Sequence, residues 1–399
     1  MEVRLPLQKL ISHSSDLLQL WNEGIELEVH GLFLIVRNIA YLDLNQEIRR
    51  GCIVSPLSVT ADNFQTVKPE THVIYFQGDA PHDKHGNKLD MLIAGEKVNV
   101  TDKISADFTF SQKPFRKQGY DNYYEKITTY INLISGPVRF IDSSISEKTF
   151  AVPLPVEDEI SVFNYLDSNS SKANITFIAE KLKGYRVAII GLGGTGSYLL
   201  DYLAKTQVME IHLYDGDIFK TNNSFRSPGA ASIEELMSRI PKVTYFENIY
   251  QNMHRGIKPH EYYITPENIN ELDGLNFIFI CVDTGEARKM IIDFLCEKSM
   301  PFIDVGIGVN IIKNKLMGTV RTTTSTPEKR DHINSKIPFT DSKENEYKNI
   351  QIAELNSLNA TFAIIKWKKL CGFYHDQENE YNSNYSLELN MLISNENKT

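Results

Sequence analysis

A run of glycines between two apolar segments is the feature of this sequence with the clearest chemical meaning. Residues 186–190 (RVAII) form an apolar run of the kind that buried strands have, and the turn at residues 191–196 (GLGGTG) follows directly. Without Cβ atoms, such a turn lets a phosphate chain approach backbone N–H groups, and the positive N-terminus of the following helix favours the anion. The turn therefore predicts a nucleotide-phosphate site, although it does not name the nucleotide. The residues expected to bind the phosphates are Gly191, Gly193, Gly194, Thr195 and Gly196.

Polar residues downstream narrow the choice of nucleotide. Asp215 ends a second apolar run, residues 210–214, about 20 residues after the turn, where a carboxylate accepts hydrogen bonds from ribose hydroxyls in NAD or ATP alike. The segments that follow do not look like those of a dehydrogenase. They are DGDIFKTNNSFR (residues 215–226), IPKV (240–243) and ICVD (280–283).

Each of these charged residues also has a plain structural interpretation. Asp215 and Asp217 could cap the loop locally, as Asp often does after a strand. Arg226 and Lys242 taken alone would be solvated surface charges, and Asp283 could be the N-cap of a helix that starts near residue 286. The register that these residues keep with one another favours a shared site.

The elements around these residues alternate between strand and helix from residue 176 onward. This order predicts an α/β fold with a doubly wound, mainly parallel, Rossmann-like sheet. A long amphipathic C-terminal helix is expected over residues 352–370, and residues 306–350 read as a polar loop that is a lid, a partner-docking segment or disordered. The expected strands are residues 186–190, 210–214, 277–282 and 301–305, and the expected buried face of the long helix is Leu355, Leu358, Phe362, Ile365 and Leu370.

The front of the chain reads as a separate small α+β domain. Apolar residues at helical spacing fill residues 4–23, and apolar runs at 32–36, 71–76 and 106–110 read as strands. The expected organisation is a front domain at 1–155, a linker at 156–175, a nucleotide-binding domain at 176–372 and a tail at 373–399.

Composition limits the class of protein. The formal net charge of −9 speaks against a nucleic-acid partner, because binding the phosphate backbone calls for a basic face. No window reaches the roughly 20 apolar residues that a membrane span needs. The four cysteines form no C-x-x-C pair, so a disulfide framework and a structural zinc site are not indicated, and a reducing cytoplasmic setting is expected.

The combined motifs resemble those of the ThiF/MoeB/HesA superfamily, the adenylating domains related to ubiquitin-activating enzymes. The family pattern reads GxGGxG, then D-x-D-x-V-x-x-x-N-L-x-R-Q, a downstream P-K, and a strand ending in T-D. In this chain Asn223 lies eight residues and Arg226 eleven residues after Asp215, as in the family. The likeness covers roughly residues 176–372. The chain departs from the pattern at Ser227, where the family has glutamine.

The resemblance implies ATP and Mg²⁺ as ligands and assigns a role to each matching residue. Asp215, with Asp217, would hold the ribose, and Asn223 with Arg226 the phosphate chain. Lys242 would face the α-phosphate, and Asp283 would hold Mg²⁺, since a hard cation takes carboxylate oxygens. Relatives also use an arginine from a partner subunit just upstream of the first strand, so Lys172 is a weak stand-in, and a homodimer is implied.

The implied activity is adenylation of the C-terminal carboxylate of a ubiquitin-like protein with a free terminal glycine, in a bacterial conjugation system. A carboxylate needs no general base, because it is ionised at neutral pH. Residues 297–370 contain no cysteine, so a thioester on this chain is not expected and a conjugating-enzyme-like acceptor would lie elsewhere. The front domain resembles an uncharacterised module found ahead of ThiF-type domains in bacteria, in the run Lys126-Ile-Thr-Thr-Tyr130, and is expected to hold the protein substrate or a conjugating partner.

Two rival functions stay open from the sequence. An NAD-dependent oxidoreductase could use the glycine turn and Asp215, but it would leave Arg226, Lys242 and Asp283 without a task. A non-catalytic ThiF-like scaffold subunit would not need the complete charged set.

Overall fold

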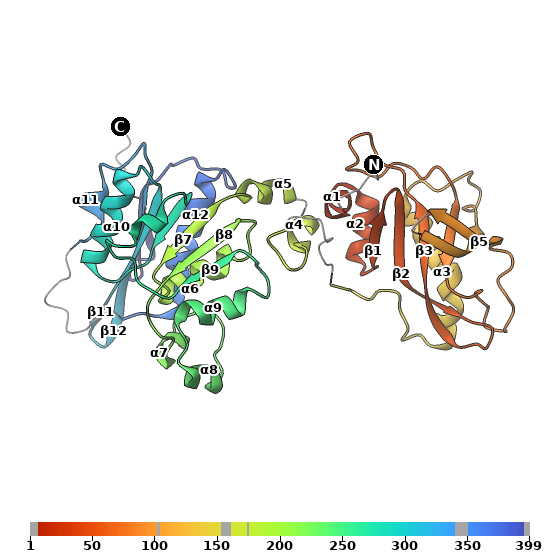
Figure 1. Ribbon diagram of the computed structural model, residues 1–399, viewed down its shortest axis with the longest axis horizontal. Coiled ribbons are helices and arrows are strands. Elements are labelled where there is room, and N and C mark those ends of the chain that lie inside the picture. The colour runs from red at the N-terminus through yellow and green to blue at the C-terminus, as the bar shows by residue number, and fades with distance from the viewer. Residues whose placement is uncertain (1–6, 102–103, 153–160, 174, 340–349, 395–399) are drawn as a thin grey trace. The chain divides into compact units, whose positions relative to one another are not determined.

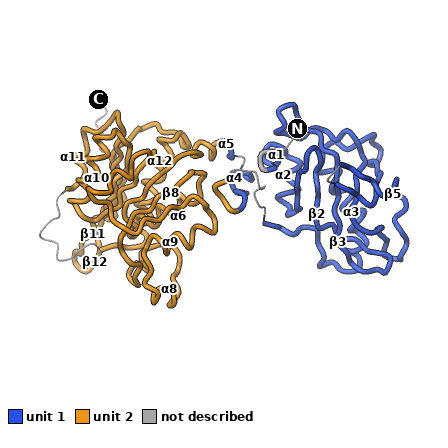
Figure 2. Tube along the Cα trace, in the orientation of Figure 1, with its two compact units in different colours: residues 1–159, 165–176 blue, residues 160–164, 177–399 orange. Residues whose placement is uncertain are grey.

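The computed structural model describes residues 7–101, 104–152, 161–173, 175–339 and 350–394. The chain forms two compact units, coloured separately in Figure 2. Unit 1 comprises Met1–Glu159 and Tyr165–Thr176, and unit 2 comprises Ile160–Asn164 and Phe177–Thr399. The boundary lies close to the expected one, but part of the expected linker is the helix α4, Ser168–Lys172, which belongs to unit 1.

Unit 1 has the α+β composition expected from the sequence. The helical spacing near the N-terminus corresponds to two short helices, α1 (Leu7–His13) and α2 (Ser15–Asn22). They are followed by an antiparallel sheet with the strand order β1-β2-β3-β4-β6-β5 and by the helix α3, Tyr123–Ile141. The strands are β1 (Leu27–His30), β2 (Phe33–Leu42), β3 (Ile48–Pro56), β4 (Val73–Gln77), β5 (Ile93–Thr101) and β6 (Ile104–Ser111).

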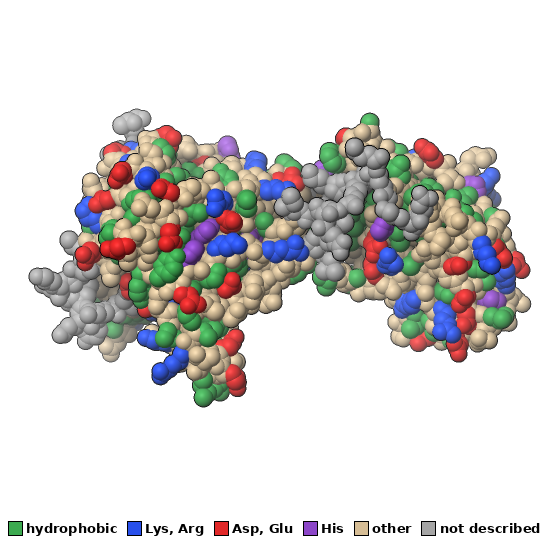
Figure 3. Space-filling view, viewed as in Figure 1, with side chains coloured by type: hydrophobic (Ala, Val, Ile, Leu, Met, Phe, Trp, Pro, Cys, Tyr) green, Lys and Arg blue, Asp and Glu red, His purple; other side chains and the backbone are tan. Residues whose placement is uncertain are grey.

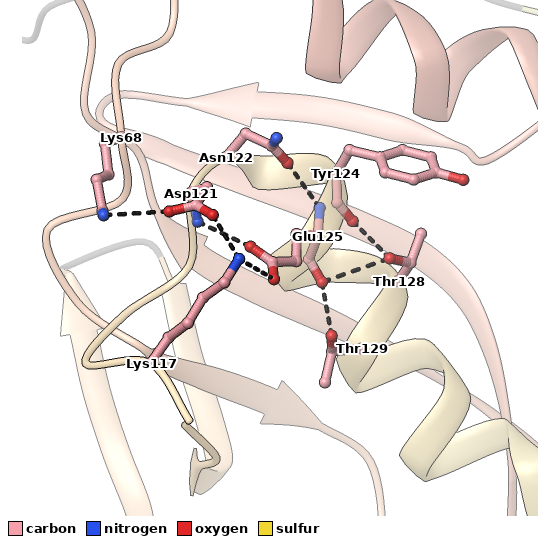
Figure 4. Close-up of polar contacts among 8 residues, drawn as sticks. All are labelled: Lys68, Lys117, Asp121, Asn122, Tyr124, Glu125, Thr128 and Thr129. Carbon is pink, nitrogen blue, oxygen red and sulfur yellow. Dashed lines mark hydrogen bonds and ion pairs between the residues drawn. The ribbon is translucent and has the colours of Figure 1, made fainter. Parts of the chain in front are cut away.

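The helix α3 packs against this sheet through a buried stripe at helical spacing, which includes Tyr123, Ile127 and Tyr130. It begins at Asn122, whose side chain accepts a hydrogen bond from the Glu125 N–H at 2.8 Å (Figure 4). The same figure shows the ion pairs of Lys68, Lys117, Asp121 and Glu125 that surround this end of the helix. A capped and charged first turn fixes where the helix starts.

Unit 2 contains the doubly wound sheet expected from the sequence, with the order β14-β13-β12-β11-β10-β7-β8-β9. The pairs β11–β10, β10–β7, β7–β8 and β8–β9 are parallel. The pairs β11–β12, β12–β13 and β13–β14 are antiparallel. The strands are β7 (Arg186–Ile190), β8 (Glu210–Tyr214), β9 (Ile257–His260), β10 (Phe277–Ile280), β11 (Phe302–Ile312), β12 (Lys315–Ser325), β13 (Asn382–Ser386) and β14 (Met391–Ser394).

Helices cover both faces of the sheet in unit 2, which explains why its central strands read as continuous apolar runs (Figure 1). Along β7, Val187 and Ile189 pack into the core under α6, α9 and α12, whereas Ala188 and Ile190 pack into the core under α10 and α11. The helices of this unit are α5 (Thr176–Ala179), α6 (Gly194–Leu203), α7 (Thr221–Ser224), α8 (Ile233–Ser238), α9 (Lys242–Tyr250), α10 (Gly285–Glu297), α11 (Ile333–Lys336) and α12 (Ala353–Leu370), with 3-10 turns at Glu180–Leu182 and Ile269–Leu272. No helix in the described ranges is long and apolar enough to cross a membrane.

The segment expected as a long polar loop is largely a β-hairpin. The strand expected at residues 301–305 continues to Ile312, and β12 returns antiparallel through a turn at Lys313 and Asn314, both with positive φ. Residues 340–349 of the expected loop lie outside the described residues. The expected tail is likewise part of the sheet, because it contributes β13 and β14.

The helix α12 lies where it was expected, but its buried face is different. Ile365 and Leu370, expected inside, are 37% and 38% exposed, and Leu358 and Phe362 are only partly buried. The helix contacts α6 on one side and β11 and β12 on the other, so small and polar residues fill the narrow space between them. The fully buried residues include Leu355, Asn356, Asn359, Ala360, Ala363 and Trp367.

Candidate active site

The glycine turn joins β7 to α6, and two of its glycines are required by packing alone. Gly191 has φ +94°, and a Cβ there would lie 2.7 Å from the Cys281 carbonyl oxygen. A Cβ at Gly196 would lie 1.9 Å from the Gly191 carbonyl oxygen. The lack of side chains at these two positions lets the turn pack closely against β10 and α6, and their expected phosphate contacts stay a prediction.

The other two glycines line a cavity of about 330 Å³. A Cβ at Gly193 would meet nothing closer than 4.0 Å, so this position faces open space. A Cβ at Gly194 would fall 2.1 Å from Nδ2 of Asn356, which occupies the space above the first residue of α6. Thr195 also lines the cavity and donates a hydrogen bond from its hydroxyl to Asn356 Oδ1 at 3.0 Å.

A carboxylate cluster at the end of β8 is bonded to the glycine turn. Asp215, only 4% exposed, accepts the Leu192 N–H at 2.7 Å through Oδ2 and the Asp217 N–H at 2.8 Å through Oδ1. Lys242, at the start of α9, is 6% exposed and donates to Asp217 Oδ2 at 2.7 Å, with Asp215 Oδ2 3.3 Å away. Lys242 is therefore not a solvated surface charge. Asp215 holds the turn in place, as its local interpretation had it, and Asp217 is the more accessible carboxylate of the two.

Tyr263, which no sequence motif indicated, covers this cluster. Its ring lies against Gly216, where a Cβ would fall 2.8 Å from the ring, and its hydroxyl donates to Asp217 Oδ1. This hydrogen bond, partial burial and the nearby charges of Asp217, Asp215 and Asp283 raise the pKa of Tyr263. Burial would raise the pKa of Asp217, but hydrogen bonds from Lys242 and Tyr263 hold it below its usual value. Asp217 is consequently ionised at neutral pH.

Asn223 lies in α7, the short helix that follows β8, and Arg226 lies two residues beyond its end. Asn223 is 6% exposed, and its Oδ1 accepts the Lys220 N–H at 2.8 Å. Arg226 has a buried Nε with no hydrogen-bond partner among the described residues. A buried, unpaired guanidinium N–H is costly, so this position suits an anionic partner. Neither residue is among those that line the cavity.

Asp283 lies on the cavity wall beside the glycine turn. It is exposed and does not cap α10, because the residue at that N-cap is Thr284 and it makes no side-chain capping bond. The cavity brings Asp283 together with residues that are far apart in the sequence, from Gly193 to Asn384. Its lining is Gly193, Gly194, Thr195, Cys281, Val282, Asp283, Arg288, Val305, Gly306, Ile307, Gly308, Thr319, Arg321, Pro338, Gln351, Asn356, Asn359 and Asn384.

A buried Arg–Asp–Arg triad forms the cationic wall of this cavity. Asp304, fully buried, accepts hydrogen bonds from Arg288 Nε at 3.0 Å and from Arg321 Nη2 at 2.6 Å. Two guanidinium groups and one carboxylate leave a formal charge of +1 on the triad. The sequence did not reveal this triad, because its members come from α10, β11 and β12 and share no local pattern.

Two of the expected site roles stay predictions. Lys172 is exposed at the end of α4 in unit 1, whereas the glycine turn belongs to unit 2. No group of three His, Cys, Asp or Glu side chains in the described part of the chain could hold a metal ion. A Mg²⁺ ion at Asp283 would need most of its ligands from phosphate oxygens and water.

The cysteines are poorly suited to act as nucleophiles. Burial raises the pKa of the Cys52 and Cys281 thiols, and it raises that of Cys371 to about 11. The Cys296 sulfur accepts a hydrogen bond from Arg330 at 3.2 Å on the side of the sheet that carries α10 and α11. Because the thiolate is the reactive form, three of these four thiols are held in their unreactive state at neutral pH.

Comparison with known families divides the chain where the structure does. Residues 170–394 match the ThiF family, and residues 15–168 match a domain of unknown function, DUF6791. Ubiquitin-like modifier-activating enzyme 5 of Drosophila persimilis is 26% identical over 161 residues, which cover 36% of this chain and 41% of that protein. Adenylyltransferase and sulfurtransferase UBA4 of Saccharomyces cerevisiae is 26% identical over 147 residues, 35% of this chain and 30% of that protein. The chain thus spans about two fifths or less of the length of these relatives.

Solved structures of Escherichia coli MccB resemble this chain at low sequence identity. The complex of MccB with MccA-N7isoASN has a TM-score of 0.47 and 16% sequence identity, and the alignment covers 57% of this chain and 68% of the MccB chain. The complex of MccB with ATP has a TM-score of 0.44 at 16% identity and covers 56% and 67% of the two chains. The ThiF match spans more than half of the present chain and coincides with the unit that holds the glycine turn, so the chain belongs to the ThiF family.

Proposed function

We propose that this protein is an ATP- and Mg²⁺-dependent enzyme that adenylates the C-terminal carboxylate of a ubiquitin-like protein and releases pyrophosphate. The observation that carries the proposal is that one cavity is lined both by Gly193 and Asp283 and by the cationic side chains of Arg288 and Arg321. A phosphate-binding turn and an anion-attracting wall in one cavity suit a reaction between a nucleotide and a carboxylate. The curated relatives are named as an activating enzyme of a ubiquitin-like modifier and as an adenylyltransferase, which supports the same reading.

The residues around the turn fit the phosphate and ribose groups of ATP. Gly193 leaves room for a phosphate oxygen, and the unpaired Nε of Arg226 offers a charged donor to the phosphate chain. Asp217 has a carboxylate accessible to ribose hydroxyls, with Asp215 behind it, and Asp283 would supply a carboxylate oxygen to Mg²⁺. In this proposal Asn223 contacts the phosphate chain and Lys242 faces the α-phosphate, as expected from the sequence.

Bound ATP supplies an electrophilic α-phosphorus: a carboxylate oxygen forms the new P–O bond while the bond to the bridging oxygen breaks and its electron pair leaves with pyrophosphate. The task of the protein is then to orient both reactants and to stabilise negative charge with preorganised cations and N–H groups. Lys242 and Arg226 are the cations that we assign to this task. Neither a general base nor a cysteine of this chain is required.

A homodimer is part of the proposal. Three large apolar side chains on the segment that carries α7 and α8 are exposed, namely Phe225 (80%), Ile233 (71%) and Met237 (76%). In Figure 3 acidic and basic side chains are intermingled on the visible face of unit 2, and apolar atoms gather on the projecting end of α8. Since Phe225 adjoins Arg226, a second copy that covers this segment would also enclose the nucleotide site. Unit 1 would then be free to hold the protein substrate or a conjugating partner.

ATP–pyrophosphate exchange with Mg²⁺ tests the proposal, with candidate ubiquitin-like proteins as carboxylate donors. We expect exchange with a free terminal glycine, none when that terminus is amidated, and at least a hundredfold loss in Asp283→Asn. The matched control is Asp293→Asn, an exposed carboxylate on α10 that pairs with Lys289 and should change little. ATP binding without exchange for any donor would favour a scaffold subunit, and preference for NADH over ATP would favour an oxidoreductase.

A further inference from the structure

Asn356 is a buried amide whose orientation is fixed by the glycine turn. It lies on the inner face of α12 and is 1% exposed. Its Oδ1 accepts the Thr195 hydroxyl at 3.0 Å, and this bond directs the other end of the amide, Nδ2, towards Gly194. The predicted site did not include Asn356, because the hydrophobic pattern predicted a different buried face for α12.

The Nδ2 group of Asn356 has no hydrogen-bond partner among the described residues. Leaving a buried N–H donor unpaired costs about 1–3 kcal/mol, and such groups in native proteins call for a partner such as a ligand. Gln351 Oε1, on the same cavity, is a second buried polar atom without a partner in the described chain. The wall that α12 presents to the glycine turn is therefore incomplete without a polar ligand.

The position of this donor identifies the chemistry of the ligand. Nδ2 lies above Gly194, the first residue of α6, a helix of 10 residues whose N-terminal N–H groups and dipole favour an anion. Gly193 beside it opens onto the cavity without obstruction. A neutral side-chain donor and a helix N-terminus that line the same cavity are suited to an oxyanion.

We propose that Asn356 Nδ2 donates a hydrogen bond to an oxygen of the nucleotide's phosphate chain, and that Thr195 positions it for this contact. The inference rests on the proposed function, since it supplies the phosphate group that ATP would bring. It adds a residue from α12, 161 positions beyond Thr195 in the sequence, to a phosphate site otherwise built from β7, α6 and α7. The packing of α12 against α6 and the recognition of the nucleotide thereby depend on the same side chain.

Asn356→Asp separates the binding role from a structural one. The aspartate keeps an acceptor for Thr195 and the volume of the side chain, and the positive end of α6 offsets part of the cost of burying its carboxylate, so the fold should be retained. The same carboxylate would repel a phosphate. By calorimetry on the full chain, we expect affinity for ATP and for inorganic tripolyphosphate to fall at least tenfold, with adenosine affinity changed less than twofold. Asn248→Asp makes the same charge change on the exposed surface of α9 and should leave all three affinities unaltered.

The outcomes distinguish this inference from the proposed function. Unchanged tripolyphosphate and ATP affinity in Asn356→Asp, with a wild-type protein active in pyrophosphate exchange, would overturn the inference and leave the function standing. An equal loss of adenosine affinity would also overturn it, because that loss would reflect a distorted site. A wild-type protein that binds tripolyphosphate through Asn356 but never catalyses exchange would support the inference and refute the function.

Discussion

Glycine-to-alanine changes at three positions of one turn should have opposite consequences for folding and for binding. A Cβ at Gly196 would lie 1.9 Å from a backbone oxygen, and essentially no real contact of this kind is under 3.0 Å, so backbone must move by about 1 Å. The obstructing atom is the Gly191 carbonyl, which cannot rotate away as a side-chain end could. Overpacking of this type costs about 1–3 kcal/mol, and we expect Gly196→Ala at the upper end.

Gly193→Ala should cost less stability than Gly196→Ala. The nearest atom would be 4.0 Å away, so the cost comes only from the backbone, whose φ of −73° and ψ of −149° lie outside the regions that alanine favours. Gly191→Ala should resemble Gly196→Ala, because it combines φ +94° with a 2.7 Å approach to the Cys281 oxygen.

Differential scanning calorimetry of the full chain measures these effects. A loss of about 3 kcal/mol corresponds to a decrease of about 6–12 °C in the transition temperature of a unit of this size. Gly193→Ala, in contrast, should lower the transition temperature less but bind ATP at least tenfold more weakly, because its methyl group enters the cavity. Equal destabilisation by Gly193→Ala and Gly196→Ala, or full stability of the latter, would refute the division of the turn into packing glycines and binding glycines.

Three further changes test other parts of the structure. Lys242→Met leaves two carboxylates, one of them 4% exposed, without their cation, and should cost about 3–5 kcal/mol in urea denaturation, whereas the exposed Lys289→Met should cost less than about 0.5 kcal/mol. Burial lowers the pKa of Lys126 in unit 1 to about 7, so between pH 7 and 9 the folded amine is neutral while the unfolded one stays protonated. Stability of unit 1 should therefore rise by about 2 kcal/mol over this range, and Lys126→Met should abolish that rise. Ile233→Glu should convert the proposed dimer to a monomer in light scattering, and an unchanged mass would exclude α8 from the interface.

The parts of the fold that could be predicted are those where one physical requirement dominates. β7 is buried on both faces from Val187 to Ile190 and is continuously apolar there, and the glycine turn between β7 and α6 tolerates few other residues. The aspartates and lysine of the carboxylate cluster were found because they keep fixed distances along the chain from that turn. Their contacts, with Lys242 between Asp215 and Asp217, confirm that they lie together.

The parts that were missed have polar residues in buried positions. Residues 322–325 of β12 are three threonines and a serine, all at most 4% exposed, and such a run reads as a loop. These side chains are buried because they pack beside the cavity and α12, where Thr323 donates to Asn382 at 2.8 Å and Thr322 to Asn359. The face of α12 was misjudged for the same reason, since Asn356 and Asn359 lie inside. Hydrophobic periodicity cannot locate a core that is built to be partly polar.

The charges of the site form two groups of opposite sign, and this arrangement suits two different kinds of chemical group. Asp215, Asp217 and Lys242 together carry a formal charge of −1, and the two carboxylates suit neutral hydroxyl donors such as those of a ribose. The cavity wall of Arg288, Asp304 and Arg321 carries +1, and its carboxylate is fully buried, so the cations are held in place before any ligand arrives. The neutral glycine turn and α6 lie between the two groups. A nucleotide bound across the turn would have its ribose at the acidic group and its phosphates towards the basic wall, where an incoming carboxylate would also be drawn.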